Sequence, residues 1–368
     1  MDSILSKLVE PKAFDAFIQE NMKRSTYVAE WKTEMKDPEY CAGKVYQAFL
    51  AEYTAAMVGS VIDKNAEKPT HQMPKASQLI GTVGRMGDEW QMDLDRLEQF
   101  FYMEGRFRNK SASFSEEQRK TEFAKLVKFL FDPYEKAVIA PHKRLDMLYF
   151  EGLFNGTQTV SLDNNKKSGV QWSYPLGVKT FKVLGAIWRK ENASTMTPIA
   201  DVMNVLDYID NKGKTVKKIR MSKKTFRNMV SADEIWKSFT LKLAKLNIQP
   251  ASVISLDMMN EYASGMDMPN FETLKKSATL QDGSEINLIP DDRVVFQCAD
   301  KVAVPKISDP LELIDKLPNK VYSSYDDNLV GYYRNEKGRF VDYEMWATPV
   351  FDGRNDFFIL KTDESEKG

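Results

Sequence analysis

The pattern of apolar and polar residues changes several times along the chain, and its clearest part is helical. Between residues 88 and 107, large apolar side chains recur every three or four positions. This spacing places them on one face of a helix. The residues concerned are Trp90, Leu94, Leu97 and Phe101. Asp88 and Glu89 fall in the first turn, where the helix dipole favours acidic residues. The sequence therefore predicts a helix that begins at Asp88.

A second helical block runs from Ser115 to Asn155. Ser115 and Gln118 have the spacing of a capping box, Asp132 before Pro133 is a second helix start, and Pro141 predicts a kink. As one bent rod, the block is about 60 Å long. Its later half is apolar on both sides, through Val138, Leu145, Leu148 and Tyr149 on one side and Met147, Phe150 and Phe154 on the other. We expect a central spine, with one side covered by other copies of the chain.

Two segments before these helices lack a core of their own. Residues 1–54 alternate short amphipathic stretches with prolines, and Val45, Phe49 and Leu50 form one helical apolar face. Such short helices seldom fold alone, so we expect an arm that docks on a larger body. Residues 57–86 have β-branched clusters at both ends and polar residues between them, which predicts an extended hairpin. A lone hairpin is marginally stable and implies a partner surface. A surface hairpin that lies on its own domain is the alternative.

Strands and helices alternate after Gly156. Two short strands flank an Asn-Asn-Lys-Lys turn, and a helix capped by Thr197 follows, with Ile199, Val202, Leu206 and Ile209 on one face. The segment 214–230 predicts a strand that ends at Met221, a cap at Ser222 and a further helix. This alternation, up to about residue 318, is typical of a compact α/β unit. Turn residues at 335–338 and 352–353 predict hairpins near the end of the chain.

Composition restricts the classes of function. The chain has 368 residues, 42% hydrophobic and 29% charged, which is enough for two or three subdomains with cores. The net charge is −1, so no overall field would hold a polyanion. Cys41 and Cys298 are the two cysteines, which fits a reducing compartment. No apolar run approaches the roughly 20 residues that cross a bilayer. We expect a soluble protein made in the cytoplasm.

Few residues point to catalysis or to metal binding. His71 and His142 are the two histidines, which excludes an HExxH motif or a site of several histidines. The sequence contains neither a Walker-type phosphate loop nor a GxSxG motif. Adjacent acidic pairs at 291–292 and 326–327 are typical of turns. We therefore expect neither an enzyme nor a bound cofactor or metal.

A basic run crosses the predicted strand and helix at 214–227. It consists of Lys214, Lys217, Lys218, Arg220, Lys223, Lys224 and Arg227. Such a run could contact phosphate groups or an acidic neighbour. It alternates with Val216, Ile219 and Met221, as a half-buried strand does, so a solvated face is the favoured interpretation. A nucleic-acid-binding protein that uses this run remains an alternative.

In the order of these parts, the chain resembles the major capsid proteins of tailed bacteriophages, which have the Hong Kong 97 capsid fold. The resemblance covers most of the chain and lies in arrangement, without a short diagnostic motif. It implies an α+β fold with five regions: an N-terminal arm (1–54), an extended hairpin called the E-loop (55–87), a peripheral domain with the spine helix (88–190), an axial α/β domain (191–320), and C-terminal strands that return to the peripheral domain (321–368). The helix over 88–107 is an addition to the minimal pattern.

The resemblance implies a structural protein of the virion. In this family, hexamers and pentamers of one chain form an icosahedral head around double-stranded DNA, and the E-loop overlies an adjacent subunit. The resemblance also implies synthesis in the host bacterial cytoplasm. It further implies contacts with portal, scaffold or decoration proteins and no membrane partner. The residues that we expect to contact other subunits are Lys64, Glu67, Lys68, His71, Lys75, Lys217, Lys218 and Arg220. An encapsulin-like compartment that holds protein cargo is an alternative with the same fold.

Overall fold

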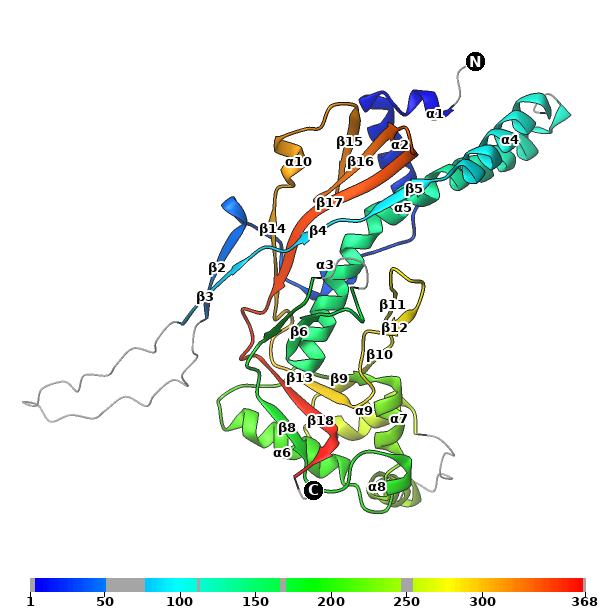
Figure 1. Ribbon diagram of the computed structural model, residues 1–368. Helices are drawn as coiled ribbons and strands as arrows, with labels where there is room; N and C mark the ends of the chain where they lie inside the picture. The colour runs from blue at the N-terminus through cyan, green and yellow to red at the C-terminus, as the bar shows by residue number, and fades with distance from the viewer. Residues whose placement is uncertain (1–3, 51–76, 111–112, 166–169, 246–253, 367–368) are drawn as a thin grey trace, which may run out of the picture.

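One long helix joins two β-sheets in this protein. A computed structural model describes residues 4–50, 77–110, 113–165, 170–245 and 254–366. Helix α5 (Glu116–Asn155) lies beside a seven-stranded sheet over its middle and reaches a five-stranded sheet at its end (Figure 1). This mixture of helix and sheet confirms the predicted α+β class. Over the described ranges, no helix combines the length and apolar character needed to cross a membrane.

Helix α5 is continuous through both of its prolines. The Ser115 hydroxyl accepts a hydrogen bond from the Gln118 backbone N–H at 3.2 Å, and the Gln118 side chain accepts one from the Ser115 N–H at 3.0 Å. This pair confirms the predicted capping box. Pro133 and Pro141 lie inside the helix, so the second start predicted at Asp132 is not used. Gly156 ends the helix with a left-handed φ of 66°, which a glycine adopts without strain.

The expectation that other copies cover one side of the spine is wrong for its later half. Residues 145–154 of α5 pack with Val295, Phe357 and Ile359 of the five-stranded sheet. Residues 126–138 pack instead with apolar side chains of the seven-stranded sheet. The apolar residues on both predicted sides are buried within the single chain. Both sides are covered because two sheets and the arm surround the helix.

The seven-stranded sheet covers one side of the spine. Its main path is β1 (Glu39–Tyr40), β14 (Val304–Ser308), β17 (Gly338–Val350), β16 (Asn328–Asn335) and β15 (Lys320–Tyr325), and β4 (Arg85–Met86) and β5 (Glu89–Met92) also pair with β17. The predicted turn at 335–338 joins β16 to β17. Val341 and Tyr343 of β17 pack in the cluster that includes the spine. The alternate residues Asp342 and Glu344 therefore face away from it.

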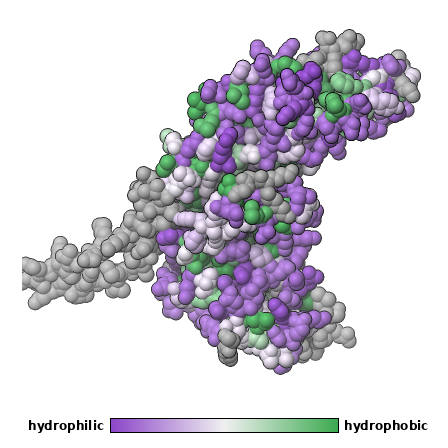
Figure 2. All heavy atoms as spheres, in the orientation of Figure 1, coloured by the Kyte–Doolittle hydropathy of each residue, from purple (hydrophilic) through white to green (hydrophobic). Residues whose placement is uncertain are grey.

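A short helix lies over the outer face of this sheet. Helix α10 (Leu311–Ile314) follows β14, and the backbone N–H of Glu312 donates to Glu344 of β17 at 3.0 Å. Hydrophilic residues make up most of the surface in Figure 2, and hydrophobic residues gather over α10. The sequence analysis placed this segment at the end of the axial α/β region, whereas its helix contacts the seven-stranded sheet.

The helix predicted to begin at Asp88 starts later. Glu89–Met92 form strand β5, in which Trp90 pairs with Val341, and helix α4 spans Leu94–Lys110. Strand pairing with β17 has overridden the helical spacing of this segment. Phe100 is the buried apolar residue in the described part of α4, whereas Leu94 and Phe101 are exposed. The predicted apolar stripe is therefore not the buried face of the helix.

The arm and the hairpin divide at a different place than predicted. The arm contains α1 (Ile4–Lys7), α2 (Pro11–Met22), α3 (Glu30–Glu34), β1 and a 3-10 turn (Ala42–Lys44). Residues 45–50 were expected to be helical but form strand β2 (Val45–Leu50), antiparallel to β3 (Ser77–Thr82). The hairpin therefore starts before residue 55, because its outgoing strand pairs with the returning one. The tip, with Lys64, Glu67, Lys68, His71 and Lys75, lies outside the described residues.

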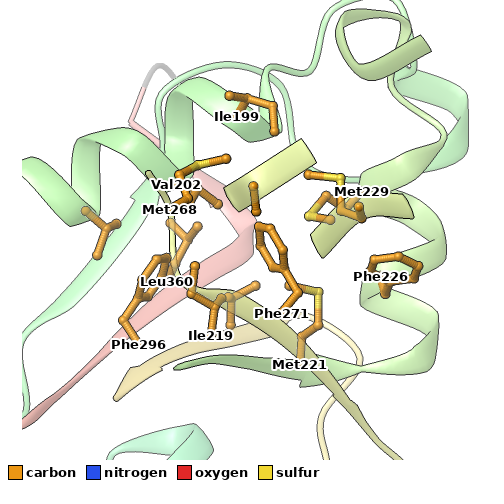
Figure 3. Packing of buried hydrophobic residues seen from close by; sticks show 14 of the residues in the cluster. Ile199, Val202, Ile219, Met221, Phe226, Met229, Met268, Phe271, Phe296 and Leu360 are labelled. Carbon is orange, nitrogen blue, oxygen red and sulfur yellow. The ribbon is translucent and has the colours of Figure 1, made fainter. Parts of the chain in front are cut away.

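The five-stranded sheet and its helices form a separate core. The strand order is β10 (Asn270–Leu274), β9 (Lys218–Ser222), β13 (Arg293–Gln297), β18 (Phe357–Ser365) and β8 (Thr180–Val183). The helices are α6 (Pro198–Asp210), α7 (Lys223–Val230), α8 (Asp233–Lys245) and α9 (Leu256–Ser264). Figure 3 shows side chains from both layers meeting, among them Val202, Ile219, Phe271, Phe296 and Leu360. The predicted strand, Ser222 cap and helix at 214–230 are confirmed.

Helix α6 begins where predicted, but its cap differs. Thr197 occupies the N-cap position without a capping hydrogen bond from its side chain. Instead, Glu234 of α8 accepts a hydrogen bond from the Ile199 N–H at 3.1 Å. A carboxylate at the positive end of a helix is favourable, so a residue distant in sequence supplies the cap.

The last strand joins a different sheet from the strand before it. Strand β18 pairs with β13 and β8 in the five-stranded sheet, whereas β17 belongs to the seven-stranded sheet. The turn at 352–353 therefore makes no hairpin, and β18 does not return to the sheet beside β17 as expected. Besides β2 with β3, the described residues form two small hairpins, β6 (Thr157–Val160) with β7 (Trp172–Pro175), as predicted, and β11 (Ser277–Thr279) with β12 (Glu285–Asn287).

Two helical glycines should respond oppositely to alanine. A Cβ on Gly152 of α5 would lie 2.7 Å from the Cζ atom of the buried Phe351 ring, whereas one on Gly105 of α4 meets open space. We expect Gly152→Ala to lower the free energy of unfolding by about 1–3 kcal/mol through overpacking. Gly105→Ala should raise it by about 0.5–1 kcal/mol through helix propensity. Urea unfolding of both variants checks this, and stabilisation by Gly152→Ala would contradict it.

Candidate assembly surfaces

The arm is bound to its own chain along its length. Its side chains form hydrogen bonds or ion pairs with the seven-stranded sheet, the spine and the segment after β17. The pairs are Asp15 with Ser323 at 2.7 Å, Ser25 with Glu135 at 2.8 Å and Lys36 with Asp352 at 2.6 Å. The described part of the arm therefore docks on its own subunit, as expected of a segment too short to fold alone.

Trp31 anchors the arm on the spine. Its backbone N–H donates to Asp146 at 2.8 Å, and its indole N–H donates to Nδ1 of His142 at 3.2 Å. Burial raises the pKa of Asp146 to about 6, against the opposing hydrogen bond from Trp31. Burial lowers the pKa of His142 to about 4, against the opposing charge of Asp326. His142 is thus a neutral acceptor at neutral pH. Among the described residues, no group of three side chains could hold a metal ion.

Arg220 ties the arm to the five-stranded sheet. Its guanidinium donates to both carboxylate oxygens of Glu34 in α3, at 2.6 and 2.7 Å, and lies 3.2 Å from Glu272. Burial alone would raise the pKa of Glu34, but the hydrogen bonds and charge of Arg220 outweigh it and lower that pKa. The Arg220 side chain is 3% exposed. Arg220 is therefore a contact within one chain and not an exposed candidate for contact with another subunit.

Half of the remaining basic residues in the run form ion pairs with acidic residues of the same chain. The ion pairs are Lys214 with Asp356 at 2.8 Å, Lys217 with Asp300 at 2.6 Å and Lys224 with Asp291 at 3.2 Å. Val216, Ile219 and Met221 are buried, which confirms the half-buried strand. Lys217 is exposed and Lys218 is half-buried, so contact of these two residues with another subunit stays a prediction.

The root of the hairpin is fixed to the seven-stranded sheet. Tyr46 and Val83 form a small buried cluster with Val350. The Gly84 N–H donates to the Thr348 hydroxyl at 2.7 Å. Strands β2 and β3 then lead away from the sheet (Figure 1), and in the described residues they pair with each other alone. The root therefore directs a ribbon that has little support from its own subunit.

Comparisons with known proteins agree with this arrangement. No protein-family model and no curated protein sequence matches the chain. Among solved structures, a putative capsid protein of an Escherichia coli prophage superposes with a TM-score of 0.54 and 11% identity, over 95% of this chain and 98% of that one. The chain has a phage capsid fold of the Hong Kong 97 type.

Two further solved structures are similar at lower scores. A phage-related protein from Bordetella bronchiseptica has a TM-score of 0.44 at 11% identity, over 95% of this chain and 97% of that one. A holo encapsulin complex from Synechococcus elongatus has a TM-score of 0.34 at 10% identity, over 94% of both chains.

Removal of the buried carboxylate beside Arg220 should be strongly destabilising. Glu34→Ala leaves a buried guanidinium without its two-bond partner, so we expect a loss of about 3–5 kcal/mol in the free energy of unfolding. The matched control is Glu272→Ala, whose carboxylate is 44% exposed and whose loss should cost at most about 1 kcal/mol. Equal effects of the two variants in urea unfolding would contradict the assignment.

Asp146 should make stability depend on pH in a distinctive direction. Its folded-state pKa of about 6 lies above the ordinary value of 3.8, so folding takes up a proton between these values. Its contribution is full below pH 3.8 and is lost as pH rises to 6. The free energy of unfolding of the unsubstituted chain, relative to that of Asp146→Asn, should fall by about 3 kcal/mol from pH 4 to pH 7. This value corresponds to a shift of about two pKa units. Parallel pH profiles in chemical unfolding would refute this.

Proposed function

We propose that many copies of this chain assemble, as hexamers and pentamers, into the icosahedral head of a phage around double-stranded DNA. The observation that carries the proposal is the likeness to the prophage capsid protein over 95% of this chain and 98% of that one. The chain then acts as a structural subunit of the virion and not as an enzyme. Portal, scaffold or decoration proteins are its further partners, and the host bacterial cytoplasm is the place of synthesis. The five-region division is part of this proposal, with the hairpin starting at strand β2 and the last strand, β18, in the five-stranded sheet.

The hairpin supports assembly on physical grounds. Its strands β2 and β3 are packed at the root through Tyr46 and Val83, and beyond the root the described pair has no other strand beside it. A two-stranded ribbon is marginally stable in water by itself. An adjacent subunit would supply the missing surface, with Lys64, Glu67, Lys68, His71 and Lys75 as the residues proposed to contact it.

Charge supports a shell that encloses DNA without binding it tightly. The net charge is −1, and four of the seven basic residues in the 214–227 run pair with acidic residues of their own chain. Each such pair lowers the number of cations that can release counterions from a nucleic acid. This pairing counts against the alternative of a dedicated nucleic-acid-binding protein. An encapsulin-like compartment differs from a phage head in its contents, which are protein cargo in place of a genome.

Electron microscopy tests the proposal directly. The full chain, expressed with and without the neighbouring virion genes, should form closed shells in negative stain, and sedimentation should show large particles. Protein that stays monomeric at high concentration under both conditions would overturn the proposal.

The contents of purified shells separate the alternatives. Nuclease-protected double-stranded DNA in particles from infected cells supports the phage head, whereas a co-purifying enzyme supports the encapsulin-like compartment. For the nucleic-acid-binding alternative, salt-sensitive DNA binding by the isolated chain, weakened by Lys217→Ala and Lys218→Ala, is the result that would favour it.

A further inference from the structure

The segment 309–319 carries α10 on the outer face of the seven-stranded sheet. It exposes its apolar side chains and turns a polar side chain toward the protein. Four large apolar side chains point to solvent: Leu311 is 47% exposed, Leu313 39%, Ile314 76% and Leu317 52%. The polar Glu312 turns inward instead, where its carboxylate lies 2.5 Å from the Lys320 ammonium. A surface helix of a monomer normally buries its apolar side. The polar side of α10 is therefore the anchor, and its apolar side is presented outward.

Several contacts fix this presentation. Lys320 is 5% exposed and lies between Glu312 and Asp342, each at 2.5 Å. Gly331 lies on β16, between the strands that carry Lys320 and Asp342. The Lys320 side chain passes over this glycine, and a Cβ there would collide with it. The Leu317 N–H donates to the Tyr322 hydroxyl at 3.1 Å. These ion pairs and this hydrogen bond therefore hold the segment with its apolar side chains exposed.

Helix α4 presents a second apolar face. Leu94 is 74% exposed, Phe101 47% and Tyr102 71%. These residues are seven and eight positions apart, so they lie on one side of the helix. From Leu94 to Phe101 the face is about 10 Å long at 1.5 Å per residue. Contiguous exposed apolar surface of this kind marks a protein contact.

The rims of the two faces carry complementary charges. Exposed Asp315 and Lys316 follow α10, and exposed Glu98 and Arg106 border Tyr102 on α4. Each face is therefore bordered by one acidic and one basic residue. Opposite charges can meet in one relative orientation of the two faces, which favours that orientation. Figure 1 places α10 and α4 on opposite sides of the seven-stranded sheet, so one copy cannot join its own two faces.

We propose that the α10 face of one copy docks on the α4 face of the next copy. The contact joins two different surfaces, and such a contact generates a ring when its rotation closes. The inference rests on the proposed function and names a surface pair through which copies associate. The occupant is a second copy of this chain.

Two double variants test the contact, one for each face. Ile314→Ser with Leu317→Ser removes the α10 face, and Phe101→Ser with Tyr102→Ser removes the α4 face. All four residues are exposed, so circular dichroism and the melting temperature should match those of the unsubstituted chain. Each variant should raise the concentration required for self-association, measured by sedimentation velocity, at least about tenfold. The matched control, Val9→Ser with Val28→Ser, replaces exposed apolar residues of the arm and should associate normally.

Mixing the two variants tests the pairing itself. Each retains the face that the other lacks, so mixing should restore the α10–α4 contact between one copy of each variant and lower the concentration required for association. Normal association of the α10 variant would overturn the inference and leave the proposed shell intact. Normal association of the α4 variant alone would show that the α10 face does not require the α4 face, which also overturns the inference. An unsubstituted chain that does not self-associate would overturn both this contact and the proposed function.

Discussion

Burial of α5 by its own chain is the constraint on which the rest of the structure depends. The helix contributes residues 126–138 to one apolar cluster and residues 145–154 to another. The first cluster includes the sheet built around β17, and the second includes β13 and β18 of the other sheet. Because protein interiors are close-packed, a helix shared by two cores fixes their relative position. The spine is thus the internal frame of one subunit.

The arm strengthens this frame with polar contacts. Trp31 and Glu34 lie three residues apart in the arm, yet Trp31 binds the spine and Glu34 binds Arg220 of the five-stranded sheet. The Arg220 pair adds specificity more than stability, because removing two charges from water costs nearly what their attraction returns. Its two parallel hydrogen bonds admit one geometry for α3 between the spine and the sheet.

The hairpin and the apolar side of α10 are surfaces that the spine, the sheets and the arm leave uncovered. The hairpin leaves the sheet after a root of three buried residues, and α10 holds its apolar side outward through Glu312 and Lys320. Both features are costly in an isolated subunit, since one lacks neighbouring strands and the other exposes aliphatic surface to water. In the proposed assembly their cost falls when copies meet, which agrees with the fold shared with a prophage capsid protein.

Local chemistry in the sequence determined much of the fold. The capping box at Ser115, the cap at Ser222, the turn at 335–338 and the apolar face of α6 depend on neighbours a few residues away, and each could be predicted. Tertiary structure alone decided that Trp90 lies in a strand, that Val45 starts the hairpin and that β18 crosses to the other sheet. It also turned Arg220 inward and Leu313 outward. Strand pairing and burial join residues hundreds of positions apart, and the spacing of apolar residues along a chain does not contain that information.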